Sequence, residues 1–492
     1  MRFDFEQCRF ADVHIGGTAP ALHGAEGSLD WSGLLRATDE WMVRAQAFGI
    51  APGHALVIRG HKEMSFVVAM LGCLCMGVAY VPVDTINPDA RLRKITGLVH
   101  AQAIYDATAD TFLPGVEQPK PLAEPDLAYI MFTSGSTGDP KGVQIGRDSV
   151  ALFAGWIREC LALGHAPAFM NQMLFSFDFS LFDLCGALDL GGSCVLCPRE
   201  VIANSELFVD RLQATKVTVW ASTPSFVRQQ MLNPRFNAEH LPALRAFVFG
   251  AESLTPRVAE ELWARFPEVR IINSYGPTEA TCSTTWVEID PELRAAAPNP
   301  FPIGVGKPYA EVFIDDGEIC MAGDHVMRGY FERPDLDAGV LFRHNGKRAY
   351  RSGDLGEMDA QGRVYFRGRK DDQIKLNGYR IELAEIDVAL SLLPGVLAGA
   401  AVVLRRPDGS LMRMVGFVEL AEPGDGEVQP LPKALKNWKE LLAQRMPTYM
   451  IPSELFVLDG LPSTANDKVD RKQLEQRYPQ LARASRSKEI HQ

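Results

Sequence analysis

The sequence has few basic residues for its size, and its cysteines do not form a recognisable framework. Its 50 Lys and Arg residues are outnumbered by 61 Asp and Glu residues, which gives a net charge of -11. A nucleic-acid partner is therefore not expected, because binding to phosphates needs a basic surface. The nine cysteines are scattered and odd in number, which agrees with a reducing compartment. Only Cys194 and Cys197 have metal-ligand spacing, and without a second such pair "GGSCVLCP" indicates a buried strand.

A targeting segment and a membrane span are also missing. The N-terminus, MRFDFEQCRFADV, has acidic residues near its start and no apolar core. We therefore expect a cytoplasmic protein without a secretory signal or membrane insertion. Residues 65–83 lack charge over nearly the length of a membrane helix, but Gly72, Gly77 and Pro82 interrupt them. A buried helix followed by a buried parallel strand that ends at Asp84 is the better prediction.

What the sequence does contain is a regular alternation of apolar β-rich segments with amphipathic helical ones. Strands are predicted at residues 54–60, 217–223, 244–250 and 269–276, and a helix at 257–266. Such alternation predicts an α/β fold with mainly parallel sheets covered on both faces. The 492 residues, 47% of them hydrophobic, can form roughly two or three domains with large cores.

The second half of the chain changes character twice. Residues 297–308 are rich in Pro and Gly, and the short strands that follow predict a smaller β-rich subdomain. After residue 382 a helix and two strands begin a further α/β module. We therefore predict an N-terminal core of residues 1–370 and a small C-terminal domain of residues 371–492, with a hinge near their boundary.

One loop carries an unusual amount of glycine and hydroxyl. Residues 129–143, YIMFTSGSTGDPKGV, lead from an apolar strand into a Ser/Thr/Gly loop that ends on Lys141. Backbone N–H groups, hydroxyls and a lysine together suit a polyphosphate. The standard P-loop is excluded because Gly142 follows the lysine. Taken alone, the loop fits a flexible connection as well as a phosphate site.

This loop resembles the phosphate loop of the adenylate-forming superfamily, which includes acyl-CoA synthetases, amino-acid adenylation domains and luciferases. The other motifs of the superfamily occur in the expected order over nearly the whole chain. They are LGCLCMGVAYVPVD (71–84), FSFDFSLFDL (175–184), NSYGPTEAT (273–281), YRSGDLG (350–356), GRKDDQIKLNGYRIE (368–382) and PSTANDKVDRKQL (462–474). The resemblance implies a large core domain, a mobile lid domain, and ATP and Mg²⁺ as cofactors.

The resemblance also assigns an ATP site. Tyr275 would pack on adenine, Thr278 would contact phosphate, and Glu279 would hold Mg²⁺. Asp354 would accept both ribose hydroxyls, as an acceptor-only group can, and Arg369 would lie beside it. Without the resemblance, these would be an exposed acidic turn and an ordinary surface arginine. The matching ATP-binding positions are Thr133, Ser134, Gly135, Ser136, Thr137, Gly138, Lys141, Asn273, Ser274, Tyr275, Gly276, Pro277, Thr278, Asp354, Phe366, Arg369 and Lys468.

By the same resemblance, Lys468 acts with Thr278 and Glu279 in catalysis. It would bridge the substrate carboxylate and the α-phosphate, although an isolated lysine near the C-terminus is otherwise a solvated side chain. The C-terminal domain would then rotate at Asp371 and present Gly378 to a phosphopantetheine arm, which a residue without Cβ lets approach closely.

A set of pocket positions predicts the acid that is activated. Asp178 matches the aspartate that pairs with the α-ammonium of an amino acid, and a helix N-cap is its alternative role. Two phenylalanines leave little room, which favours a small side chain. The matching positions are Asp178, Phe179, Phe182, Ala221, Val248, Gly250, Ser274, Cys282, Ser283 and Lys468.

Within the superfamily the chain is similar to D-alanine:carrier-protein ligases. It departs from them at Gly250, where they typically have cysteine, and at Phe179 and Phe182, which replace aliphatic residues. D-alanine is the leading substrate, with glycine, L-alanine or another small amino acid close behind. No carrier signature (Gly-Gly-x-Ser or Asp-Ser-Leu) occurs, so a separate carrier protein is expected in trans. Less favoured functions are those of an acyl-CoA synthetase and of a non-catalytic regulator that binds a nucleotide or an amino acid.

Overall fold

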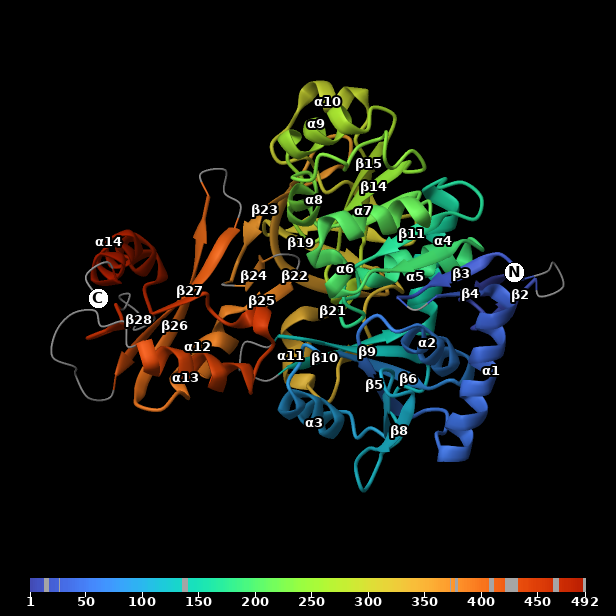
Figure 1. Cartoon of the computed structure of the whole chain (residues 1–492), viewed down its shortest axis with the longest axis horizontal. Coiled ribbons are helices and arrows are strands. Elements are labelled where there is room, and N and C mark those ends of the chain that lie inside the picture. Colours follow the sequence, from blue (N-terminus) through green and yellow to red (C-terminus); the bar gives the residue numbers. More distant parts are fainter. Residues whose placement is uncertain are drawn as a thin grey trace. The chain divides into compact units, whose positions relative to one another are not determined.

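The computed structural model describes residues 1–12, 17–25, 27–134, 140–371, 373–376, 379–406, 411–420, 432–462 and 469–489. The chain divides into two compact units (Figure 1). The first unit comprises residues 1–85, 96–132 and 142–370, and the second comprises residues 86–95, 133–141 and 371–492. Among the described residues, no helix combines the length and the apolar character needed to cross a bilayer.

A seven-stranded sheet has the order β20-β10-β9-β6-β5-β7-β8, with β5 parallel to both β6 and β7. Its strands are β5 (Ala55–Gly60), β6 (Ala79–Asp84), β7 (Ala103–Asp106), β8 (Thr111–Pro114), β9 (Leu127–Thr133), β10 (Lys141–Gly146) and β20 (Gly329–Tyr330). Helix α2 (Met64–Met76) packs on the strands β5 and β6 and on the helix α1 (Trp31–Phe48). It is buried over most of its length. The prediction of a buried helix and a buried parallel strand for residues 65–83 is therefore confirmed.

A nine-stranded sheet has the order β17-β16-β15-β14-β13-β11-β12-β3-β4. Its central strands β12, β11, β13, β14 and β15 are parallel, which confirms the α/β prediction. The strands are β3 (Pro20–His23), β4 (Ser28–Asp30), β11 (Ala168–Asn171), β12 (Ser193–Leu196), β13 (Val219–Ser222), β14 (Ala246–Phe249), β15 (Arg270–Tyr275), β16 (Thr285–Glu288) and β17 (Val305–Gly306). Cys194 lies in β12, so this segment is the buried strand that was predicted.

Helices follow these strands and contribute to two hydrophobic cores. The amphipathic helix predicted at residues 257–266 is present as α9, which buries Val258, Ala259, Leu262 and Trp263. The helices of this part are α4 (Arg147–Cys160), α5 (Ser180–Asp189), α6 (Arg199–Ala203), α7 (Ser205–Ala214), α8 (Pro224–Gln230), α9 (Pro256–Arg265) and α10 (Pro291–Ala296), and α3 (Asp89–Leu98) is divided between the two units.

The predicted small β-rich subdomain is also present. It is an antiparallel five-stranded sheet in which β22 pairs with β19, β21 and β23. Its elements are β18 (Glu311–Asp315), β19 (Glu318–Ala322), β21 (Leu341–His344), β22 (Lys347–Met358), β23 (Val364–Arg369) and the helix α11 (Pro334–Val340).

The second unit has its own apolar cores on either side of a three-stranded sheet, β26-β27-β28. Helices α12 and α14 both pack on β26. The elements are β24 (Gln373–Leu376), β25 (Tyr379–Glu382), α12 (Leu383–Ser391), β26 (Val396–Arg405), β27 (Leu411–Leu420), α13 (Pro432–Ala443), η3 (Thr448–Met450), β28 (Glu454–Leu458) and α14 (Arg471–Glu489). The helix and strands predicted after residue 382 are thus confirmed.

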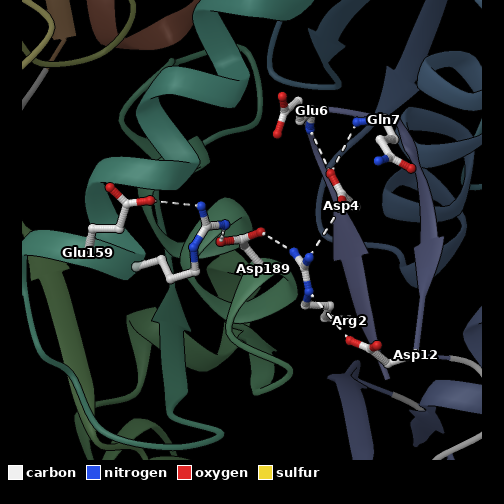
Figure 2. Close-up of polar contacts among 8 residues, drawn as sticks. Arg2, Asp4, Glu6, Gln7, Asp12, Glu159 and Asp189 are labelled. Atoms are coloured by element: carbon white, nitrogen blue, oxygen red, sulfur yellow. Dashed lines mark hydrogen bonds and ion pairs between the residues drawn. The ribbon is translucent and has the colours of Figure 1, made fainter.

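The N-terminal hairpin, β1 (Arg2–Asp4) and β2 (Arg9–Ala11), is joined to the end of α5 by a buried carboxylate. Figure 2 shows Arg2 between Asp189 on one side and Asp4 of the hairpin and Asp12 directly after it on the other. The side chain of Asp189 is only 2% exposed, and it accepts from Arg2 at 3.0 Å and from Arg158 at 2.7 Å. Burial raises the pKa of Asp189, and the two arginines oppose that shift.

We expect Arg2→Met and Arg158→Met each to lower the free energy of unfolding by about 1 kcal/mol or less, because one cation remains beside Asp189. The double variant leaves the buried carboxylate unpaired and should lose about 3–5 kcal/mol, more than the sum of the single losses. Urea unfolding of the four proteins measures this coupling. Adding Asp189→Asn to the double variant should restore much of the loss, and additive single effects would contradict the coupling.

Candidate active site

Three neighbouring parallel strands place many of the predicted residues together. The register pairs Ala221 of β13 with Val248 of β14, and Phe249 with Asn273 of β15. Ligands of such sheets bind beyond the carboxyl ends of the strands. The residues at or just beyond these ends are Ala221, Val248, Gly250, Asn273, Ser274 and Tyr275. The Asn273 side chain donates to the Pro302 carbonyl at 2.8 Å and the Ser274 hydroxyl to the Thr285 carbonyl at 3.1 Å.

The turn after β15 is tight and strained. A Cβ atom at Gly276 would lie 2.4 Å from Cα of Ser283, so only glycine fits the close approach of these two backbones. Pro277 precedes the short helix η2 (Thr278–Ala280), and Thr281 and Cys282 then both have positive φ angles, 54° and 67°. Such angles cost about 1–3 kcal/mol each in residues other than glycine and tend to occur at functional sites.

Glu279 lies on this turn and is fully buried. Its Oε1 accepts a hydrogen bond from the hydroxyl of Tyr330 at 2.7 Å, and its carbonyl accepts from the N–H of Met327 at 2.8 Å. Thr278 beside it is partly exposed. The sequence did not predict Tyr330, because its partner is 51 residues away along the chain. Among the described residues no cluster of three or more metal-ligating side chains occurs.

Asp354, Arg369 and Tyr275 form a second group. Asp354 and Arg369 are paired across β22 and β23, and Arg369 Nη1 donates to Asp354 Oδ1 at 2.6 Å. The Tyr275 hydroxyl donates to Asp354 Oδ2, and burial followed by the Asp354 charge raises the pKa of Tyr275 well above its usual value. Phe366 packs against the hydrophobic cluster that contains Tyr275. The structure therefore brings together the side chains predicted for adenine and ribose.

The predicted amino-acid pocket is assembled from distant segments. Phe179, Phe182, Ala221, Val248 and Cys282 belong to one buried cluster. The rings of Phe179 and Phe182 are 6.2 Å apart, and a Cβ atom at Gly250 would lie 3.1 Å from Cζ of Phe179. The Phe179 ring thus takes the space into which a side chain at position 250 would extend.

Asp178 comes directly before this aromatic pair and is partly buried. The residue directly before α5 is Phe179, whose own backbone angles are helical (φ -63°, ψ -20°). Both predicted roles of Asp178, as the partner of the substrate ammonium and as a helix N-cap, therefore stay predictions. Burial raises the pKa of the Cys282 thiol, and the Asp178 charge adds to that shift. The Asp178 carboxylate therefore lies within electrostatic range of Cys282, another predicted pocket residue.

Lys307 is a pocket neighbour that the sequence analysis missed. Its Nζ donates to Ser283 Oγ at 2.6 Å and lies 3.3 Å from the ring centre of Trp156 and 4.5 Å from that of Phe153. Both rings contact Phe182. Burial lowers the pKa of Lys307 well below its usual value. Nothing in the segment VGKP distinguishes this lysine from an exposed one.

The remaining predicted residues belong to the second unit or its boundary. The Ser134 hydroxyl donates to the Arg380 carbonyl at 3.1 Å and accepts from the N–H of Glu382 at 3.0 Å. Thr133 ends β9, and Lys141 begins β10. The Asp371 carboxylate accepts from the N–H of Gln373 at 3.2 Å. Outside the described residues are Gly135, Ser136, Thr137, Gly138, Gly378 and Lys468.

Comparison with known proteins gives consistent matches. A family model described as AMP-binding enzyme matches residues 16–331. A D-alanine--D-alanyl carrier protein ligase of Bacillus velezensis is 35% identical, covering 85% of this chain and 88% of its own; one from Bacillus licheniformis is 33% identical, covering 93% and 96%. The fold is similar to the Vibrio cholerae adenylation domain AlmE in complex with glycyl-adenosine-5'-phosphate, with a TM-score of 0.81, 20% identity and 98% of each chain covered.

Proposed function

This chain belongs to the AMP-binding enzyme family, and we propose that it activates D-alanine with ATP and transfers it to a carrier protein. The first step forms D-alanyl-AMP and releases pyrophosphate. In the second, the phosphopantetheine thiol of a separate carrier attacks the acyl carbon and AMP leaves. The observation that carries the proposal is the similarity to D-alanine--D-alanyl carrier protein ligases over most of both chains.

For ATP, the proposal uses the group around Asp354. The buried Asp354 accepts hydrogen bonds from the ribose hydroxyls, held in place by the 2.6 Å contact with Arg369. Tyr275 and Phe366 supply aromatic surface for adenine. The loop from Thr133 to Lys141 and the hydroxyl of Thr278 bind the phosphates. Carboxylate attack on the α-phosphate brings two anions together, and Lys468 offsets their repulsion.

Mg²⁺ is part of this proposal, and the donor set around Glu279 suits it. Mg²⁺ is commonly held by one or two carboxylates together with substrate phosphates and water. Glu279 is a single buried carboxylate whose Oε1 is oriented by the Tyr330 hydroxyl. It would hold the ion, which supplies positive charge to the phosphates. The absence of a larger ligand cluster among the described residues does not conflict with this coordination.

For the amino acid, we propose that Asp178 pairs with the α-ammonium group and that the aromatic pair limits the side chain. Phe179 against Gly250 and Phe182 beside it support a pocket that accepts little more than a methyl group. D-alanine is the first candidate because of the relatives, and glycine is the second because the ring of Phe179 closes the space at Gly250. A simple acid would leave Asp178 without the cation for which it is suited.

For the second step, we propose that residues 371–492 act as a lid that turns at Asp371. Two contacts at the boundary support this position. The Lys370 N–H donates to the Gly353 carbonyl of the first unit, whereas the Asp371 carboxylate accepts from Gln373 of the second. Gly378 would line the path of the phosphopantetheine arm. We place the reaction in the cytoplasm, with the carrier acting in trans.

Amino-acid-dependent ATP–pyrophosphate exchange tests the proposal. The purified chain is assayed with D-alanine, L-alanine, glycine, D-serine, L-serine, acetate and butyrate. We expect the largest kcat/KM with D-alanine and very little exchange with acetate or butyrate. Preference for glycine or L-alanine would reassign the substrate within the same reaction. Exchange with simple acids alone would contradict the role of Asp178 and indicate an acyl-CoA synthetase.

A further inference from the structure

Lys62 is a buried cation that the proposed reaction does not use. It lies between β5 and α2 with 4% of its surface exposed. Its Nζ donates to Asn171 Oδ1 and to the Met173 carbonyl, the latter at 2.5 Å. The same nitrogen lies 4.0 Å from the ring centre of Phe175. All three contacts lie just before Asp178.

Asn171 in turn contacts residues that follow Asp178 in the sequence. Its Nδ2 donates to the Ser180 carbonyl at 3.1 Å and to Asp183 Oδ2 at 3.3 Å. Lys62 and Asn171 together therefore hold the carbonyl of Met173 and the carbonyl of Ser180. The segment between these two points carries Asp178 and Phe179. Within it, the Phe177 N–H donates to the Leu174 carbonyl at 2.9 Å, so the segment is compact as well as held at both ends.

The neighbouring residue, His61, is held by hydrogen bonds of its own, and these fix the turn from which the Lys62 side chain extends into the interior. His61 Nε2 accepts from the N–H of Arg199 at 3.2 Å, which leaves the proton on Nδ1 to be donated to Asp84 at 2.7 Å. Arg199 also contacts Asp84. This network joins the start of α6 to β6 and to the turn that carries Lys62.

Burying the Lys62 ammonium costs free energy, so a contribution to stability does not explain why a lysine occupies this position. Burial lowers the pKa of Lys62 to about 8, although the nearby groups Asp183, Asp84, Cys194 and Cys197 oppose that shift. An apolar side chain of similar length would fill the same space without desolvating a charge. What an apolar side chain would not supply is the pair of directed hydrogen bonds to Asn171 and Met173.

We propose that Lys62 is a positioning residue for amino-acid activation, holding the Met173–Ser180 segment so that Asp178 and Phe179 meet the substrate in a fixed geometry. The inference rests on the proposed function, because Asp178 is taken as the partner of the substrate ammonium. Lys62 acts through this segment and does not touch the substrate. A small misplacement of a group that binds the substrate can lower the reaction rate greatly.

The test is steady-state pyrophosphate exchange with full-length Lys62→Met. We expect the KM for the amino acid to rise by about 10-fold or more while the KM for ATP does not change, because only the Asp178 segment is released. Lys216→Met, at an exposed lysine of the same unit, is the matched control and should behave as the wild type. Lys62→Gln keeps an N–H donor without the charge, and its KM for the amino acid should lie between those of the wild type and the methionine variant.

A double-mutant cycle separates positioning from general damage. Lys62→Met combined with Asn171→Leu should raise the amino-acid KM by less than the product of the single effects, because both changes release the same segment. Unchanged KM values, or equal increases in both, would overturn the proposal. If Lys62→Met does not fold, the same readouts on Lys62→Gln decide. Wild-type protein inactive with every amino acid would overturn the proposed function itself, and the Lys62 proposal with it.

Discussion

Lys468→Ala is expected to lower the rate of amino-acid-dependent pyrophosphate exchange by about 10²–10³-fold, the size of effect seen when a preorganised donor to a developing charge is removed. The carboxylate and the α-phosphate repel each other as they approach, and the lysine ammonium is proposed to lie between them. Without it, the proposed magnesium ion and the proposed phosphate loop would remain, so binding of ATP should change far less than turnover. The loss should therefore appear in kcat and not in the KM for ATP.

The second half-reaction distinguishes this role from general damage to the protein. Chemically prepared D-alanyl-AMP, supplied to Lys468→Ala with a phosphopantetheinylated carrier, should be converted to the thioester at close to the wild-type rate. Lys472→Ala, at an exposed lysine of α14, is the matched control and should preserve both steps. Normal pyrophosphate exchange in Lys468→Ala would remove this residue from the catalytic assignment, and equal loss of both steps would indicate a structural role.

Asp178→Asn is expected to lower kcat/KM for the amino acid by about 10²–10³-fold, because it removes the proposed partner of the desolvated substrate ammonium group. The amide keeps the size of the side chain but not its charge. The effect should be confined to the amino acid: the KM for ATP should not change, because the groups around Asp354 and Glu279 are untouched. Steady-state exchange at varied D-alanine and varied ATP measures both quantities.

The matched control for this variant is Asp316→Asn, in the exposed turn between β18 and β19, where φ is 51°. Asparagine adopts such an angle readily, so this change should leave exchange and stability as in the wild type. Comparable losses in the two variants, or an unchanged KM for D-alanine in Asp178→Asn, would contradict the pairing of Asp178 with the substrate ammonium.

Residues of the proposed site differ in how far the sequence could identify them. Asp354 and Arg369 were found through separate motifs, and the structure pairs them at 2.6 Å across β22 and β23. Asp178 was left with two roles, and both stay predictions, because Phe179 directly before α5 already has helical backbone angles. Lys468 and most of the phosphate loop fall outside the described residues, so their roles remain predictions.

The sequence could not identify Tyr330, Lys307 or Lys62. Each meets a site residue from another part of the chain: Tyr330 contacts Glu279, Lys307 contacts Ser283, and Lys62 contacts Asn171 across 109 positions. A lysine that follows a strand or precedes a proline has the same local pattern whether it is buried or exposed. Local pattern reports side-chain periodicity and turn chemistry, and it contains no information about pairs that only folding brings together.

By itself, the sequence determined the fold class and the type of the elements that carry a clear apolar pattern. Apolar β-rich segments predicted β5, β13, β14 and β15, because buried parallel strands need apolar side chains on both faces. The tertiary structure alone decided which side chains share a site, how Phe179 fills the space beside Gly250, and where buried charges are placed. Those outcomes depend on distances between segments far apart in the chain, which are set by how the sheets and helices pack.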